Sequence, residues 1–210
     1  MPLFLKKFVL GPLQNNTYLL ADEQSRSAVV IDPSFEIDKL VTEINRLDLK
    51  LRSIWITHAH FDHIAGVERL SRAFSSSVEI ALHPADLPLW KKGGGSDELG
   101  FTIETGKEPT IMLDLQNVLK VGENEIRVFY TPGHTPGHVT FYCKSLNAAF
   151  CGDLIFFHGI GRTDLPGGDY DQLIQSIRTQ ILTLPPLTHL LSGHGPETTV
   201  TEESNKNPFL

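Results

Sequence analysis

The sequence predicts an α/β fold in which two β-sheet layers are flanked by helices. Short runs rich in β-branched and aromatic residues, typical of strands, recur in both halves of the chain. Between them, apolar residues spaced three and four apart indicate amphipathic helices that would pack on the sheets. Because no linker or low-complexity segment interrupts this alternation, we expect one domain spanning residues 1–210.

The first half of the chain carries most of the expected alternation. Apolar residues follow the helical period from Ile37 to Leu47 and again from Val67 to Phe74. The glycine-rich segment Lys91–Lys107 predicts a mobile surface loop or lid. The strands expected here are Phe4–Leu10, Thr17–Asp22, Ala28–Asp32, Leu51–Thr57 and Val78–Leu82.

The second half repeats this organisation without repeating the sequence. The expected strands are Glu125–Tyr130, Val139–Cys143, Ala148–Gly152 and His189–Ser192. A helix is expected from about Tyr170 to Leu182, between the last two of these strands.

Composition excludes several classes of function. A net charge of −7, from 18 Lys and Arg against 25 Asp and Glu, lacks the basic excess typical of nucleic-acid binding. The early apolar stretch Leu3–Leu13 contains Lys6 and Lys7 and is too short to span a membrane, so we expect a cytoplasmic protein. Cys143 and Cys151 match no zinc-ribbon spacing and are expected to be free, buried thiols.

Three histidines and an aspartate are concentrated directly after the expected strand Leu51–Thr57. They are His58, His60, Asp62 and His63. In extended chain His58 and His60 point the same way, and a turn into a helix can aim Asp62 and His63 at a neighbouring point. The spacing therefore predicts two adjacent metal positions.

Three further candidate ligands lie at other expected strand ends. His134, Asp153 and His194 each follow an apolar strand, and each is preceded by a glycine that permits a tight backbone bend. A single strand-end Asp more often caps a turn, and a single His is more often a surface or core residue. Together with the His58–His63 cluster, however, the three indicate one metal centre.

These seven positions resemble the metallo-β-lactamase superfamily, whose pattern is H-x-H-x-D-H followed by separate His, Asp and His residues. The resemblance implies an αββα sandwich with two mixed β-sheets. It also implies that Asp153 bridges two ions, and we expect Asp62 and Asp153 to be essential for catalysis. By the resemblance, His58, His60 and His134 hold the first metal, and Asp62, His63 and His194 hold the second.

Within that superfamily the chain looks most like short, single-domain members of the glyoxalase II group. The resemblance runs nearly end to end and includes Thr131–His138, Gly161–Asp164 and the terminal Asn207–Leu210. It implies a thioester of the S-lactoylglutathione type as substrate. Full-length glyoxalase II proteins carry a helical C-terminal extension that supplies much of the glutathione site. The sequence after His194 is short, so the thiol carrier stays open.

The ligand set also predicts the chemistry. Imidazole and carboxylate ligands suit zinc first, and iron or manganese also fit. Two such ions can share a water and lower its pKa from 15.7 to about 7. We expect the resulting bridging hydroxide to attack a thioester carbonyl polarised at the first site.

Several alternatives remain at this level. A persulfide dioxygenase resembles the chain in the same seven positions and uses a single iron, while a lactonase or phosphodiester hydrolase would keep the site and change the pocket. Arg162 and Asp164 could bind a substrate carboxylate or form a structural ion pair. Trp90 could cover the site or pack in the core. Asp32 or Thr57 could accept the second N–H of a ligating imidazole. The oligomeric state is left open.

Overall fold

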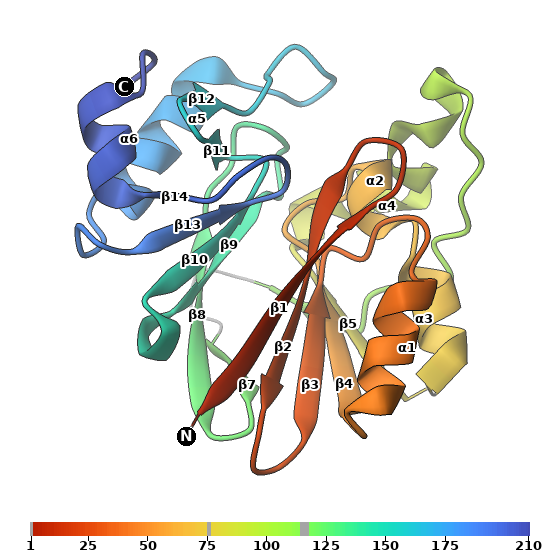
Figure 1. Ribbon diagram of the computed structural model, residues 1–210. Helices are drawn as coiled ribbons and strands as arrows, with labels where there is room; N and C mark the ends of the chain where they lie inside the picture. Colours follow the sequence, from red (N-terminus) through yellow and green to blue (C-terminus); the bar gives the residue numbers. More distant parts are fainter. Residues whose placement is uncertain (1, 75–76, 114–117) are drawn as a thin grey trace.

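Two β-sheets pack face to face in the computed structural model, which describes residues 2–74, 77–113 and 118–210 (Figure 1). Within these residues each of the two sheets has six strands. The first sheet contains, in spatial order, β1 (Leu3–Leu10), β2 (Asn15–Asp22), β3 (Ser27–Ile31), β4 (Lys50–Trp55), β5 (Glu79–Leu82) and β6 (Ile111–Met112). Strands β1 to β3 are antiparallel, whereas β3 to β6 are parallel.

The second sheet is antiparallel except at one pair of strands. In spatial order it contains β14 (Thr198–Thr199), β13 (His189–Ser192), β10 (Ala148–Gly152), β9 (Val139–Cys143), β8 (Asn124–Tyr130) and β7 (Val118–Val121). Only β10 and β13 run parallel among these pairs, so their carboxyl ends lie at the same edge. A small hairpin, β11 (Ile155–Phe156) with β12 (Gly159–Ile160), follows β10.

Helices cover the outer face of each sheet, which gives four layers and confirms the predicted architecture (Figure 1). Helices α1 (Asp38–Arg46) and α3 (Val67–Phe74) lie on the first sheet, and α5 (Tyr170–Ser176) and α6 (Val200–Lys206) lie on the second. The remaining helical turns are α2 (Phe61–Ile64), η1 (Pro84–Asp86), α4 (Leu87–Lys91), η2 (Gly93–Leu99), η3 (Lys144–Leu146) and η4 (Ile177–Ile181). No helix in the described part of the chain has the length and apolar character needed to cross a membrane.

The core between the sheets is held by aromatic contacts. The rings of Trp55 and Phe141, from opposite sheets, lie 5.5 Å apart, and those of Tyr18 and Phe150 lie 5.2 Å apart edge to face. Such pairs contribute about 0.5–1.5 kcal/mol beyond the area they bury. Each sheet also shares one further core with the helices on its outer face. Each sheet is thereby packed on both faces, and the loops that follow its strands are available to carry functional residues.

Some predicted elements differ in detail from the structure. The helix expected from Tyr170 to Leu182 changes at Ile177 into a π-helical turn, η4. Within Lys91–Lys107, predicted as a surface loop or lid, η2 forms a 3-10 segment in which glycines with positive φ allow sharp turns. Phe101, just after η2, stacks on Phe61 with ring centroids 5.1 Å apart, so this segment is packed against α2.

Two further predictions concern individual side chains. Cys143 and Cys151 are free and buried, as expected. Trp90 is 1% exposed and belongs to the core between the first sheet and its helices, which confirms the packing alternative over the lid.

Candidate metal centre

All seven predicted ligand residues meet at one end of the two sheets. His58 and His60 follow β4, and Asp62 and His63 lie in α2. The other three, His134, Asp153 and His194, follow β8, β10 and β13. Residues from both sheets are therefore needed to complete the cluster.

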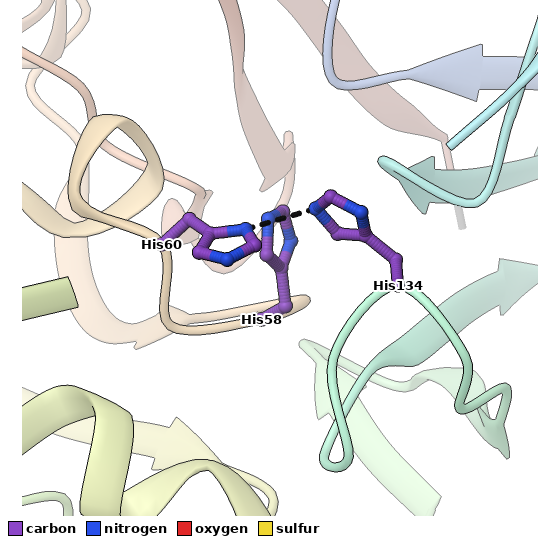
Figure 2. A group of neighbouring side chains, drawn as sticks. All are labelled: His58, His60 and His134. Carbon is purple, nitrogen blue, oxygen red and sulfur yellow. Dashed lines mark hydrogen bonds between the residues drawn. The ribbon is translucent and has the colours of Figure 1, made fainter. Parts of the chain in front are cut away.

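The first group of ligands consists of His58, His60 and His134. One ring nitrogen of each lies within 4.8 Å of the others. His60 Nδ1 and His134 Nε2 are 2.9 Å apart. Figure 2 shows His58 and His60, on one loop, pointing toward His134 on another. Three imidazoles that converge in this way suit a borderline transition metal.

The second group consists of Asp62, His63 and His194. Asp62 Oδ2 lies 3.1 Å from His194 Nε2 and 3.6 Å from His63 Nε2. Within these three residues the possible ligand atoms again lie within 4.8 Å of one another. One carboxylate and two imidazoles thus face a common point.

Asp153 lies between the two groups. Its Oδ1 is 3.3 Å from His63 Nε2, and its Oδ2 is 3.8 Å from His134 Nε2 and 3.7 Å from His194 Nε2. One carboxylate therefore faces atoms of both groups, which is the arrangement required of a bridging ligand.

Hydrogen bonds on the far side of the rings orient the imidazoles. The Nδ1–H groups of His63, His134 and His194 donate to Asp32 Oδ2, the Arg162 carbonyl and the Leu13 carbonyl at 2.9, 2.7 and 3.0 Å. In the neutral form of each ring, a proton held on Nδ1 in this way leaves Nε2 as an acceptor facing the cluster. His58 Nδ1 lies 3.1 Å from the Thr57 hydroxyl. The expected contacts of Asp32 and Thr57 with ligand imidazoles are thus confirmed.

The glycines that precede the strand-end ligands have two different roles. Gly133 and Gly152 have φ angles of +135° and +47°, so they permit the sharp bends that were predicted. Gly193 has no positive φ, but a Cβ there would lie 2.2 Å from Asp153 Oδ1. The predicted bend is present at Gly193 as well, and the lack of a Cβ there also permits the close approach of the Asp153 carboxylate.

Burial sets the protonation of the first group. It lowers the pKa of His58 well below its usual value, lowers that of His60 to about 3, and lowers that of His134. These imidazoles are therefore neutral near pH 7, as a metal ligand must be.

Opposite charges set the protonation of His63, in the second group, and of Asp153, between the two groups. For His63, burial acts to lower the pKa, but the neighbouring carboxylates outweigh it and raise the pKa well above its usual value. The pKa of Asp153 is lowered because its histidine neighbours outweigh the effect of burial. Asp153 therefore stays ionised.

Two buried atoms test whether these residues fit a metal. His58 Nε2 and Asp153 Oδ1 have no hydrogen-bond partner among the described residues, although both are buried. An unsatisfied buried polar atom costs about 1–3 kcal/mol. An ion bound by nitrogen and carboxylate oxygen would satisfy both atoms, so the residues fit the divalent metals expected of this pattern.

Two residues near the cluster were missed by the sequence analysis. The Asn15 amide nitrogen lies 3.1 Å from His63 Nε2. Asp86 is fully buried, and it accepts hydrogen bonds from Ala59 and Thr135, which neighbour His58, His60 and His134. Neither residue belongs to the seven-position pattern, and their partners are distant in sequence, so only the structure identifies them.

A cavity of about 990 Å³ opens over the cluster. Five of the seven cluster residues line it: His60, Asp62, His134, Asp153 and His194. The rest of its lining includes apolar residues, the cations Lys91, Lys92 and Arg162, and the carboxylates Asp97 and Glu98. Arg162 is held by Asp164 through two hydrogen bonds of 2.7 Å each, which confirms the structural ion pair. A cavity of this size accommodates a small organic substrate.

A histidine and aspartate cluster at the loop end of an αββα sandwich defines a class of metal-dependent hydrolase. The sequence profile of the Metallo-beta-lactamase superfamily matches residues 10–194, and the chain belongs to that superfamily. The chain is 36% identical to "Probable metallo-hydrolase YqgX" of Bacillus subtilis, over 98% of this chain and 96% of the relative. It is 35% identical to "Hydroxyacylglutathione hydrolase GloC" of Haemophilus influenzae, over 94% of this chain and 93% of the relative.

Solved structures give the same assignment. The B3 metallo-β-lactamase BLEG-1 superposes with a TM-score of 0.89 at 39% identity, covering 99% of both chains. TTHA1623, solved in a di-iron-bound form, gives a TM-score of 0.88 at 39% identity, covering 98% of this chain and all (100%) of that one. ETHE1 from Myxococcus xanthus gives 0.80 at 26% identity, with 98% and 83% covered. The fold and the divalent-metal-binding character of the chain follow from this family membership.

Proposed function

We propose that the chain is a dinuclear metallohydrolase that cleaves small thioesters of the S-lactoylglutathione type. The observation that carries the proposal is the position of Asp153, whose carboxylate faces both ligand groups at 3.3–3.8 Å. Similarity to a hydroxyacylglutathione hydrolase and to a di-iron protein supports the substrate class and the two ions.

Seven side chains would hold the ions. His58, His60 and His134 would hold one ion, Asp62, His63 and His194 would hold the other, and the Asp153 carboxylate lies between the two groups. Zinc is the metal we favour, with iron or manganese as alternatives of similar ligand preference. Ions bound in this way lower the pKa of a water ligand toward about 7 and polarise a carbonyl oxygen.

The chain's own residues prepare the site for this reaction. Burial keeps His58 and His60 neutral, so no proton competes for their ligand nitrogens. Asp153 is held ionised between the groups. The cavity admits substrate from the side of His60 and His194, while His58 and His63 are completely buried behind them. The acyl carbon of a thioester would thus approach from the cavity side.

Metal analysis with a thioester assay tests the proposal. We would purify the chain without added metal or oxygen, measure metal per chain, and follow thiol release from S-lactoylglutathione. Two ions per chain with thiol release would support the proposal. A single iron, with oxygen consumed on addition of glutathione persulfide and no thioester cleavage, would overturn it in favour of a persulfide dioxygenase.

Two variants test the assignment of the sites. Asp153→Ala is expected to lose both ions and most activity, because its carboxylate touches both groups. Asp62→Ala is expected to lose chiefly the second ion, since Asp62 lies against His63 and His194. Near-normal turnover in Asp153→Ala would contradict the mechanism.

A further inference from the structure

Asp86 is a completely buried carboxylate that is not one of the proposed ligands. Its Oδ2 accepts a hydrogen bond from the backbone N–H of Ala59 at 2.9 Å and another from the Thr135 hydroxyl at 2.8 Å. Its Oδ1 accepts from the backbone N–H of Gly137 at 2.6 Å. Two backbone N–H groups and one hydroxyl thus bind the same carboxylate, which fixes its position firmly.

The partners of Asp86 lie in the two segments that carry the first ligand group. Ala59 separates His58 from His60, and Thr135 directly follows His134. Asp86 comes just after β5, which runs parallel to β4, so both strands deliver their following loops to the same edge. At the strand ends, the Val139 N–H donates to the Thr57 carbonyl at 2.8 Å. Asp86 provides a further connection between the loop that follows β4 and the loop that follows β8, next to the ligand residues.

The Asp86 side chain does not cap α4, the helix that follows it. It occupies the N-cap position of α4, where an aspartate side chain commonly accepts from a nearby backbone N–H. Here the side chain makes no capping bond. A Cβ at position 137 would lie 2.5 Å from the Asp86 nitrogen and 2.7 Å from Oδ1, so the close approach requires glycine. Both observations indicate that the carboxylate binds the two segments that carry the ligands and not the helix that follows it.

We propose that Asp86 is a positioning residue that holds His60 and His134 facing each other and so sets the affinity of the first group for a divalent ion. This inference rests on the proposed metal-dependent function. His60 Nδ1 and His134 Nε2 come from separate loops and lie 2.9 Å apart, so a small relative shift of the loops changes the geometry that an ion meets. Loss of a residue that supports metal ligands typically lowers metal affinity by about 10–100-fold.

The test compares Asp86→Asn with the unaltered chain. Cobalt is titrated into the metal-free protein in competition with a chromophoric chelator, and the visible absorption of bound cobalt is recorded. We expect one of two ions to bind about 10–100-fold more weakly, with an altered cobalt spectrum, while the other ion is unchanged.

Glu203→Gln is the matched control. Glu203 is also a fully buried carboxylate, and it accepts hydrogen bonds from Thr198, Asn207 and the His158 backbone at 2.5, 2.7 and 3.1 Å. None of these partners belongs to the ligand groups. This variant should therefore lose thermal stability but keep the cobalt spectrum and both affinities.

A milder pair of variants decides the case if Asp86→Asn does not fold. Thr135→Val removes one hydrogen bond to Asp86, and Thr135→Ser keeps the hydroxyl. We expect weaker first-site binding in the valine variant and rescue in the serine variant. If Asp86→Asn folds and binds cobalt like the wild type, the inference about Asp86 is overturned but the proposed function is not. If Asp86→Asn does not fold, wild-type cobalt binding by Thr135→Val has the same meaning. An unaltered chain that binds no ion would overturn the proposed function as well.

Discussion

Replacing Asp32 with asparagine should weaken the second metal site through the proton on His63. The Asp32 carboxylate is 2% exposed and accepts three hydrogen bonds. Oδ1 accepts from the Thr57 N–H at 2.8 Å, and Oδ2 accepts from the Thr57 hydroxyl at 2.6 Å and from His63 Nδ1–H at 2.9 Å. Asparagine has nearly the same shape, but it presents an NH₂ group in place of one oxygen.

The size of the effect follows from this arrangement. With the amide nitrogen facing His63, Nδ1 can no longer carry a proton, so the neutral imidazole keeps its proton on Nε2, the atom that faces Asp62 and Asp153. With the amide reversed, the Thr57 N–H loses its acceptor, at a cost of about 1–3 kcal/mol in the free energy of unfolding. We expect the second ion to bind about 10–100-fold more weakly, which corresponds to about 1.4–2.8 kcal/mol.

The assay separates these two effects. Urea unfolding of the metal-free protein measures stability, and titration against a chelator measures the two affinities. Asp22→Asn serves as control, because Asp22 is also buried and accepts from the Ser25 N–H at 2.7 Å, but contacts no ligand. It should lose stability alone. Two ions bound to Asp32→Asn with wild-type affinities would refute the reasoning.

Three further predictions concern other parts of the chain. Hydrogen bonds from Arg46 and then Lys6 lower the pKa of Glu43 from 4.5 to about 2, so its contribution to stability is present above pH 4.5 and lost as the pH falls. The difference in Tm between wild type and Glu43→Gln should accordingly close between those values, and a constant difference would contradict this. Trp90→Ala should lower the free energy of unfolding by about 3–5 kcal/mol in urea titrations, whereas an unchanged value would argue against core packing. Gly193→Ala should displace Asp153 and reduce metal affinity at least about tenfold, and normal metal content after dialysis would exclude that clash.

The ligands could be predicted from sequence because each carries a local signal. His58, His60, Asp62 and His63 share one short stretch, and the other three follow apolar strands that really do end at the same edge. The contact of Asp32 with His63 was also foreseeable as an alternative, because a ligating imidazole needs an acceptor for its other N–H.

Asp86 and Asn15 carry no such signal. Asp86 follows His83-Pro84-Ala85 and looks like an ordinary helix cap, and its partners lie 27 to 51 residues away along the chain. Only the parallel pairing of β4 with β5 brings it to Ala59. Helix α6 was also missed, although the Thr199 hydroxyl accepts from the Glu202 N–H, a capping pattern that sequence inspection could have used.

The division of the first ligand group between two sheets links metal binding to the assembly of the whole chain. His58 and His60 belong to the half built on the first sheet, and His134 belongs to the half built on the second. A ligand that binds only the native state stabilises it by about 2.7 kcal/mol at a free concentration 100 times its Kd. An ion bound between the two sheets would therefore stabilise their packing against each other, and any local unfolding that separated the sheets would release the ion.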